Sequence, residues 1–302
     1  MRKKDKRALI SFIVLLIIGV YYFYTDNISK SNNKDVQYKT QETTKITSDD
    51  KLNVSFIDVG QADSILIQNN GESMLIDAGN NEDGDKLVNY FNSIGISEFK
   101  YVVGTHAHED HIGGMDNVIE NFKIDNFYMP DVITTTATFE DVLDALDSKS
   151  VAFQTPEVDS TFNLGDASIR VIYVGSDGSD LNDSSIVLKL VYGENSFLFT
   201  GDATSKVEKT ILNKDINSDV LKVGHHGSNY SSTTEFLKAV NPKYAVISVG
   251  VNNTYRHPAD STLSKLKELG TKVYRTDDSG TVIASSDGKN ITFQTMNTDT
   301  NG

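Results

Sequence analysis

The amino-acid sequence predicts an α/β fold in which two mixed β-sheets are sandwiched between helices, a four-layer αββα arrangement. Short β-branched runs alternate along the chain with segments of helical periodicity. Strands joined by hairpin turns occur in both halves of the chain, so each half can supply one sheet. Several strands are apolar on both faces, for example residues 244–247, as strands covered on both sides require. We expect this domain to span residues 51–292.

In the first half of the domain, the predicted strands gather around two turn signals. Residues 52–59 form one alternating run, and Gly60-Gln61-Ala62 separates it from a second strand at 64–68. The Asn-Asn-Gly turn at 69–71 leads into a strand at 73–76, which predicts a hairpin. The following elements are helix 87–94, strand 101–103, helix 114–122, strand 126–129 and helix 139–148.

The second half repeats the alternation of strands and helices. Its predicted elements are strands 167–174, 185–191 and 197–200, helix 204–212, strand 220–223, helix 234–240, strand 244–249 and helix 261–269. A terminal hairpin is predicted to turn at Asp287-Gly288. We expect residues 293–302 to form a disordered tail.

The first 24 residues predict a membrane anchor. Residues 1–7 form a basic tail, and an apolar run follows from Ala8 to Tyr24. At 1.5 Å per residue, its roughly 17 residues reach about 26 Å, enough to cross a bilayer core. The run ends in bulky aromatic residues typical of a membrane interface, whereas a cleaved signal peptide ends in small residues. We therefore expect a transmembrane signal anchor at 8–24 with a cytoplasmic basic tail.

Residues 25–50 are nearly all polar, so they predict a flexible linker that cannot bury enough apolar surface to fold. By the positive-inside rule, the domain that follows this linker lies outside the cytoplasm. The sequence thus predicts a single-pass protein of the cell membrane with an extracellular domain. If the apolar run is cleaved, the domain is secreted instead.

The composition excludes several kinds of chemistry. The 302 residues include no Cys, which rules out disulfide scaffolds, thiolate metal sites and Cys nucleophiles. The formal net charge of -14 argues against binding nucleic acid through an extended basic surface, because that mode depends on Lys and Arg. A nucleic-acid enzyme whose positive charge comes from metal ions is not excluded. Any transition-metal site must consist of His and carboxylate ligands.

All six histidines fall in three short loops, each of which follows a predicted strand. They are His106, His108 and His111 in the first loop, His225 and His226 in the second and His257 in the third. Asp110 adds a carboxylate to the first loop, which can fold around one or two small cations. Because Ca²⁺ and Mg²⁺ do not need imidazole ligands, the pattern favours Zn²⁺, Mn²⁺ or Fe.

These loops resemble those of the metallo-β-lactamase superfamily of two-metal hydrolases. The resemblance rests on the His-x-His-x-Asp-His loop, preceded by residues 75–79 and followed by residues 199–202. Four further motifs resemble the extracytoplasmic hydrolase domain of ComEC-type competence proteins, and choline-phosphate esterase domains are also similar. These motifs are residues 56–61, 182–185, 219–228 and 253–258. The resemblance covers residues 52–285 and implies the αββα fold.

The resemblance also implies a set of ligands for two divalent ions, Zn²⁺ or Mn²⁺. It gives His106 and His108 to the first ion, Asp110, His111 and His226 to the second, and Asp202 as the bridge between them. Lactam-hydrolysing members have a further His between 111 and 225, which is absent here; Asp183 could replace it, or form an Asx turn instead. Asp77 lies where the family has an acid that orients the metal loop, although a turn-forming role fits equally.

For the reaction, the resemblance implies attack of a metal-activated hydroxide on a phosphodiester, with Asp110, His225 and His257 as catalytic residues. His225 would bind substrate or protonate the leaving oxygen, and the reverse order of His225 and His226 remains open. Lys222 is a weaker candidate, because within a strand it can simply face solvent.

We expect a phosphodiesterase or nuclease of the ComEC-like type. The alternatives are a phosphodiesterase for cell-wall phosphorylcholine and a non-catalytic metal-binding receptor. No protein partner can be inferred.

Overall fold

The computed structural model describes residues 51–176 and 178–296. The predicted basic tail, signal anchor at 8–24 and linker at 25–50 lie outside this part of the chain. Within it, none of the helices combines the length and the apolar character that crossing a bilayer requires.

The first sheet has eight strands in the described part of the chain, in the order β15-β14-β1-β2-β3-β4-β5-β6. The strands are β1 (Leu52–Phe56), β2 (Ser64–Asn69), β3 (Glu72–Ala78), β4 (Glu98–Val103), β5 (Lys123–Tyr128), β6 (Phe153–Gln154), β14 (Thr281–Ser286) and β15 (Ile291–Met296). Strands β3 to β6 pair in parallel, whereas the other neighbours are antiparallel. The parallel strands point their carboxyl ends toward one edge of the sheet.

The second sheet has seven strands among the described residues, in the order β13-β12-β11-β10-β9-β8-β7. The strands are β7 (Thr161–Leu164), β8 (Ala167–Tyr173), β9 (Val187–Tyr192), β10 (Asn195–Phe199), β11 (Val220–Lys222), β12 (Tyr244–Ile247) and β13 (Lys272–Arg275). Strands β10 to β13 pair in parallel and β7 to β10 antiparallel. Each sheet is therefore mixed, as predicted.

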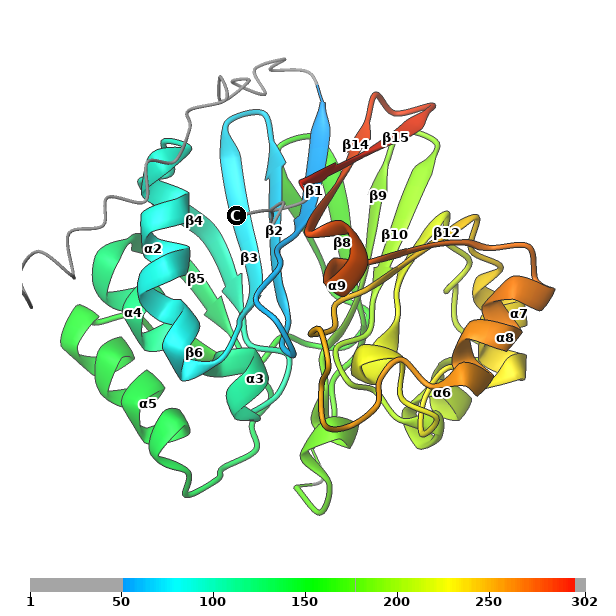
Figure 1. The fold of residues 1–302 in the computed structure, drawn as a ribbon. Helices are drawn as coiled ribbons and strands as arrows, with labels where there is room; N and C mark the ends of the chain where they lie inside the picture. The colour runs from blue at the N-terminus through cyan, green and yellow to red at the C-terminus, as the bar shows by residue number, and fades with distance from the viewer. Residues whose placement is uncertain (1–50, 177, 297–302) are drawn as a thin grey trace, which may run out of the picture. The chain divides into compact units, whose positions relative to one another are not determined.

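Helices cover the outer face of each sheet (Figure 1). The first sheet is covered by α2 (Gly84–Ser93), α4 (Met115–Asn121) and α5 (Ala137–Lys149), and the second by α6 (Ser205–Ile211), α7 (Thr234–Val240) and α8 (Asp260–Glu268). Shorter turns of helix are η1 (Asn81–Asp83), α3 (Glu109–Ile112), η2 (Leu181–Ser184), η3 (Gly224–Gly227) and α9 (Thr276–Ser279). The predicted four-layer αββα sandwich is confirmed.

Alternating side chains of the strands hold the four layers together. In β2, Ile65 and Ile67 pack between the two sheets, while Leu66 packs beneath the helices of the first sheet. In β10, Phe197 lies between the sheets and Leu198 packs under the helices of the second. Each such buried side chain contributes about 1.5–3 kcal/mol to folding. This explains why both faces of these strands are apolar.

The domain extends beyond the boundary predicted at residue 292. Strand β15 pairs with β14 and continues to Met296, so residues 293–296 are not part of a disordered tail. The ring of Phe293 stacks on Tyr274 at 4.4 Å between centroids and contacts Tyr244 at 4.7 Å. These tyrosines belong to the second sheet, and their contact orders a segment whose own sequence is mostly polar.

Candidate metal centre

Loops that follow strands of both sheets come into contact at one edge of the sandwich. His106 and His111 come from the loop after β4, Asp202 from the turn after β10, and His226 from the turn after β11. In open α/β sheets, ligands bind beyond the carboxyl ends of the strands. The fold therefore brings together polar residues that are far apart in the sequence, at the position where such folds place their sites.

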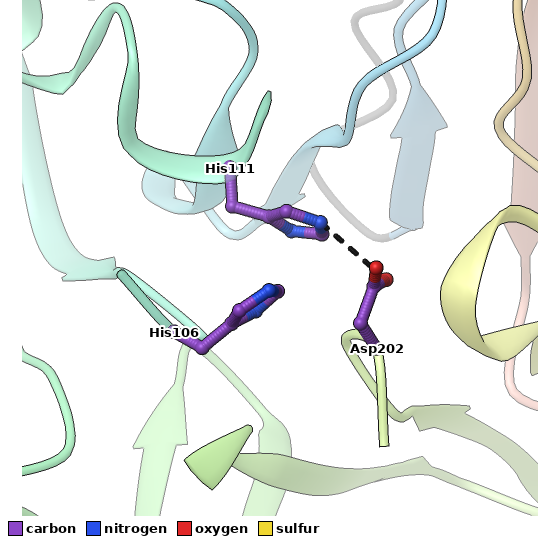
Figure 2. Close-up of side chains that lie close together, drawn as sticks. All are labelled: His106, His111 and Asp202. Carbon is purple, nitrogen blue, oxygen red and sulfur yellow. Dashed lines mark ion pairs between the residues drawn. The ribbon is translucent and has the colours of Figure 1, made fainter. Parts of the chain in front are cut away.

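One group of possible metal ligands consists of His106, His111 and Asp202 (Figure 2). The three side chains are buried, and their donor atoms lie within 4.8 Å of one another. His111 Nε2 lies 3.4 Å from Asp202 Oδ1 and has no hydrogen-bond partner. A buried nitrogen of this kind normally has a partner, so its position here suits a ligand to a cation.

A second group consists of Asp110, His111 and His226, so it shares His111 with the first. His226 Nε2 lies 3.2 Å from Asp110 Oδ2 and 3.6 Å from Asp202 Oδ2. Its other nitrogen, Nδ1, donates to the carbonyl oxygen of Ser248 at 2.9 Å. Because a carbonyl can only accept, the proton is on Nδ1, which leaves Nε2 free to bind a metal ion.

Asp77 lies behind this loop and holds it in place. Its carboxylate accepts hydrogen bonds from the backbone nitrogen and the hydroxyl of Thr105, each at 2.7 Å, and from His111 Nδ1 at 2.8 Å. Burial raises the pKa of Asp77, although His111 opposes that effect. The structure thus places Asp77 where an acid that orients the metal loop must lie. Asp77 also has a positive φ of 59°, so it shapes the turn as well.

The charges in the centre act strongly on one another. Burial alone would lower the pKa of His111, yet the carboxylate of Asp202 raises it well above its usual value. The pKa of His226 is raised for the same reason. Burial opposes ionisation of Asp202 and Asp110, but the neighbouring imidazoles lower the pKa of both carboxyls. The imidazoles thus balance the carboxylates of the cluster, a role that a bound cation could take over.

Comparison with known proteins agrees with this geometry. Residues 57–251 match the family model described as the Metallo-beta-lactamase superfamily. The chain belongs to this superfamily. The family resemblance stated from the sequence is confirmed.

Relatives with similar sequences include two competence proteins. The chain is 32% identical over 250 residues to ComE operon protein 3 of Bacillus subtilis, an alignment that covers 76% of this chain and 32% of the relative. It is 33% identical over 231 residues to Competence protein ComA of Neisseria gonorrhoeae, which covers 75% of this chain and 31% of the relative. The chain thus spans about a third of the length of these relatives.

Solved structures share the fold at low sequence identity. The metallo-beta-lactamase fold protein YhfI from Bacillus subtilis matches with a TM-score of 0.55 and 14% identity, covering 78% of this chain and all of that one. CmlA, a diiron beta-hydroxylase from Streptomyces venezuelae, matches with a TM-score of 0.52 and 16% identity, covering 76% of this chain and 53% of that one. These likenesses support the architecture alone.

The residues of the centre fit the metal ions that the superfamily fold usually binds. Three groups of donor atoms share His111 among the described residues, the third with Asp63 and Asp77, and Asp202 lies within ion-pair distance of both His111 and His226. The buried His111 Nε2 has no other partner, and the donor set is imidazole and carboxylate, which suits Zn²⁺, Mn²⁺ or Fe. These donor groups could hold one or two ions, with Asp202 among the ligands.

Two of the predicted ligands, His108 and Asp183, are not members of these donor groups. His108 Nδ1 lies 2.9 Å from His106 Nε2, so the two rings contact each other directly. The structure does not bring Asp183 into any of these groups. Its carboxylate accepts a short hydrogen bond from the Thr204 hydroxyl and forms an ion pair with Lys206 Nζ at 3.0 Å. Asp183 thus contacts helix α6 and has its own protein partners.

His225 and His257 lie together beside the donor groups. Their rings meet edge to face at 5.7 Å between centroids, and His225 Nε2 is 3.9 Å from Asp202 Oδ2. Burial lowers the pKa of both imidazoles, which favours their neutral forms. The Nδ1 atom of each ring has no hydrogen-bond partner. Both side chains are partly exposed, so part of each ring is open to a substrate although its Nδ1 is buried, whereas His226 is held by Ser248 and by the carboxylates.

Asp63 and Lys222 form a buried ion pair that was not predicted from the sequence. Lys222 does not face solvent: it is 1% exposed, and its Nζ forms an ion pair with Asp63 Oδ2 at 2.7 Å. Asp63 Oδ1 lies 3.6 Å from His226 Nδ1, and the Asp63 backbone nitrogen donates to the carbonyl of Asp110 at 3.0 Å. The backbone carbonyl of Asp63 also accepts from the backbone nitrogen of Gly79 at 2.8 Å.

One sequence signal could have revealed this ion pair. Both charged residues adjoin or interrupt apolar strands, where an unpaired charge is costly, and their signs are opposite. Asp63 therefore ties together the loop of Asp110, the turn after β3 and the end of β11.

Proposed function

We propose that this protein is a membrane-anchored, extracytoplasmic, metal-dependent phosphodiesterase that hydrolyses nucleic acid. The observation that carries the proposal is the set of donor groups that share His111, next to the partly exposed imidazoles of His225 and His257. The similarity to proteins named for competence supports DNA as the substrate. With a net charge of -14, the chain must recognise phosphate locally rather than through a broad basic surface.

When bound, two divalent ions would supply a nucleophile from water near neutral pH and offset the charge of the phosphate oxygens. His106, Asp110, His111, Asp202 and His226 would hold these ions. Asp77 fixes the imidazole of His111, and the carbonyl of Ser248 fixes that of His226, in each case through the Nδ1 proton. The chain thereby holds the ligands in position before substrate arrives, so little reorganisation is needed during the reaction.

His225 is the residue best placed to assist departure of the leaving oxygen. Its backbone nitrogen donates to Asp202 Oδ1 at 3.1 Å, which fixes the residue next to the donor groups. Its ring contacts those of His257 and His226 edge to face, and its Nε2 lies 3.9 Å from Asp202 Oδ2. In its protonated form, which the lowered pKa of His225 disfavours, a histidine positioned in this way can transfer a proton to an alkoxide leaving group; such catalysis typically contributes about 10²- to 10⁴-fold to a rate.

Location at the membrane is part of the proposal and rests on the apolar run at 8–24. We expect the full chain to leave cell membranes with detergent but not with alkaline carbonate. Protease added to intact cells should remove the domain. A domain that is protected until the cells are broken would contradict the outward orientation.

The activity is tested with the full chain, purified in detergent. It should hydrolyse bis(p-nitrophenyl) phosphate and single-stranded DNA, lose both activities on removal of metal by a chelator, and regain them with Zn²⁺ or Mn²⁺. The metal content, measured by mass spectrometry, should reach at least one ion per chain. A metal-loaded protein that hydrolyses neither substrate would overturn the proposal and leave the receptor alternative. Preferential hydrolysis of p-nitrophenyl phosphorylcholine would favour the cell-wall alternative.

A further inference from the structure

A row of rings leads from the candidate metal centre to the surface. His225 lies beside Asp202, and its ring contacts that of His257. The ring of Tyr255 in turn stacks on His257, with 5.7 Å between centroids and 23° between planes. Tyr255 is 69% exposed, so one face of its ring is covered by His257 while the rest is open to solvent.

The loop that carries Tyr255 is held in a defined shape. The side chain of Asn253 donates to the carbonyl oxygens of Gly250 and His257, at 2.9 and 2.7 Å, and accepts from the backbone nitrogen of His257 at 2.9 Å. The backbone nitrogen of Gly250 donates to the Gln61 side chain at 3.1 Å. Tyr255 is thus an exposed aromatic residue on a braced loop, which lowers the entropy lost when a ligand packs on it.

This loop packs against the loop of the histidine pair. The backbone nitrogen of Ala259 donates to the carbonyl of Gly227 at 2.9 Å, and a Cβ on Gly227 would come within 2.5 Å of Pro258 Cβ. The loop of the histidine pair carries a second exposed aromatic residue, Tyr230, which is 71% exposed. Of these two exposed tyrosines, Tyr255 is the one connected to the donor groups, through the ring contacts with His257 and His225.

We propose that Tyr255 forms a base-stacking subsite, on which a nucleobase flanking the scissile phosphodiester of a single-stranded nucleic acid lies. This inference rests on the proposed function and names its substrate class. Stacking suits an acidic chain, because it contributes affinity that does not depend on basic side chains. A flat ring with one open face matches a planar base. A quaternary ammonium is better held by a cage of several rings, and Tyr255 stacks on His257 alone among the ring contacts of the described residues.

The test compares two oligonucleotides on the full chain: oligo-dT and an abasic oligonucleotide of the same length, which keeps the phosphodiesters but lacks the bases. Tyr255→Ala should lower the ratio of kcat/KM for oligo-dT to that for the abasic oligonucleotide by roughly 5- to 150-fold, the effect of about 1–3 kcal/mol per stacked base. The loss should appear mainly in KM. Tyr255→Phe keeps the ring and should retain the ratio.

Met296→Ala removes an apolar side chain that is 50% exposed on edge strand β15 and serves as a control for surface truncation. If Tyr255→Ala lowers kcat/KM equally for both oligonucleotides, Tyr255 supports the loop and binds no base, and the inference is wrong. If it impairs only hydrolysis of p-nitrophenyl phosphorylcholine, the subsite holds choline and the inference is also wrong.

Direct binding separates this inference from the proposed function. Affinity for phosphorothioate oligo-dT, which resists hydrolysis, and for an abasic phosphorothioate is measured by fluorescence anisotropy. Base-dependent binding that Tyr255→Ala abolishes supports the subsite even if no substrate is hydrolysed. Equal affinity of the unaltered chain for both oligonucleotides overturns the subsite, even if the protein proves to be a phosphodiesterase.

Discussion

The floor and the rim of the candidate metal centre differ in how deeply their side chains are buried. The floor, defined as Asp63, Asp77 and Lys222, is at most 1% exposed, and each residue contacts polar groups from other segments. The rim, defined as His225 and His257, is partly exposed; the Nδ1 atom of each ring has no hydrogen-bond partner among the described residues, and neither does Asp63 Oδ1 in the floor. A buried, bonded floor fixes geometry, whereas a partly open rim can exchange protons and contact substrate. Variants at the two places should therefore fail in different ways.

The largest effect is expected at Asp202, which lies between floor and rim. Asp202→Asn keeps an oxygen to accept the hydrogen bond from the His225 backbone but removes the charge that lies near His111 and His226. Metal content should fall below one ion per chain and hydrolysis should fall at least 10³-fold, as mass spectrometry and a steady-state assay can measure. An Asp202→Asn protein with full metal content would show that Asp202 does not bind metal.

Asp183→Asn is the matched control for that experiment. Asp183 is as buried as a ligand would be, but its carboxylate is bonded to Thr204 and Lys206. We expect its loss to leave the metal content unchanged. A drop to the level of Asp202→Asn would instead establish Asp183 as the ligand that the sequence analysis considered.

The second effect tests the floor through folding stability. Lys222→Met leaves the carboxylate of Asp63 buried without its cation, which typically costs about 3–5 kcal/mol. The double variant Lys222→Met with Asp63→Asn should recover much of this loss, because no unpaired charge remains. Circular dichroism during denaturant unfolding can measure both, since the chain has no Trp for fluorescence. A loss below about 1 kcal/mol in the single variant would mean that the pair does not support the floor.

The floor and the rim also differ in how far the sequence could predict them. The histidine loops were visible because their residues are nearly contiguous, and a loop can gather neighbours around a cation. The ion pair of Asp63 and Lys222 was not visible, because Asp63, in the loop before β2, meets Lys222, in β11, only when both sheets are assembled. The same reason explains strand β15, whose order depends on Phe293 packing against Tyr274. The sequence predicted the four layers well because alternating apolar residues are a local signal.

The third effect separates the two neighbouring histidines. His225→Ala should keep the metal content while kcat falls about 100-fold, the usual size of a lost proton donor. His226→Ala should lose metal, because His226 Nε2 lies among the carboxylates and its Nδ1 is fixed by Ser248. Metal analysis and steady-state kinetics on the two proteins check both expectations. The opposite pattern would exchange the roles of the two residues, the order that the sequence left open.

The smallest effect is expected at Asp77, which acts on the metal only through His111. An asparagine side chain has one acceptor oxygen. It cannot accept from both the Thr105 backbone nitrogen and His111 Nδ1, so Asp77→Asn should loosen the imidazole. Loss of such a partner typically lowers metal affinity 10- to 100-fold, which competition with a fluorescent chelator can measure.

Glu109→Gln is the control for the Asp77 variant. It removes an exposed carboxylate next to Asp110, and this carboxylate accepts only from the Asn81 backbone among the described residues. Its metal affinity should match that of the unaltered chain. Equal affinities for both variants would show that Asp77 shapes the turn through its positive φ and does not orient His111. Weaker metal binding in Asp77→Asn alone would establish that the floor sets the strength of the centre through hydrogen bonds that never touch the metal.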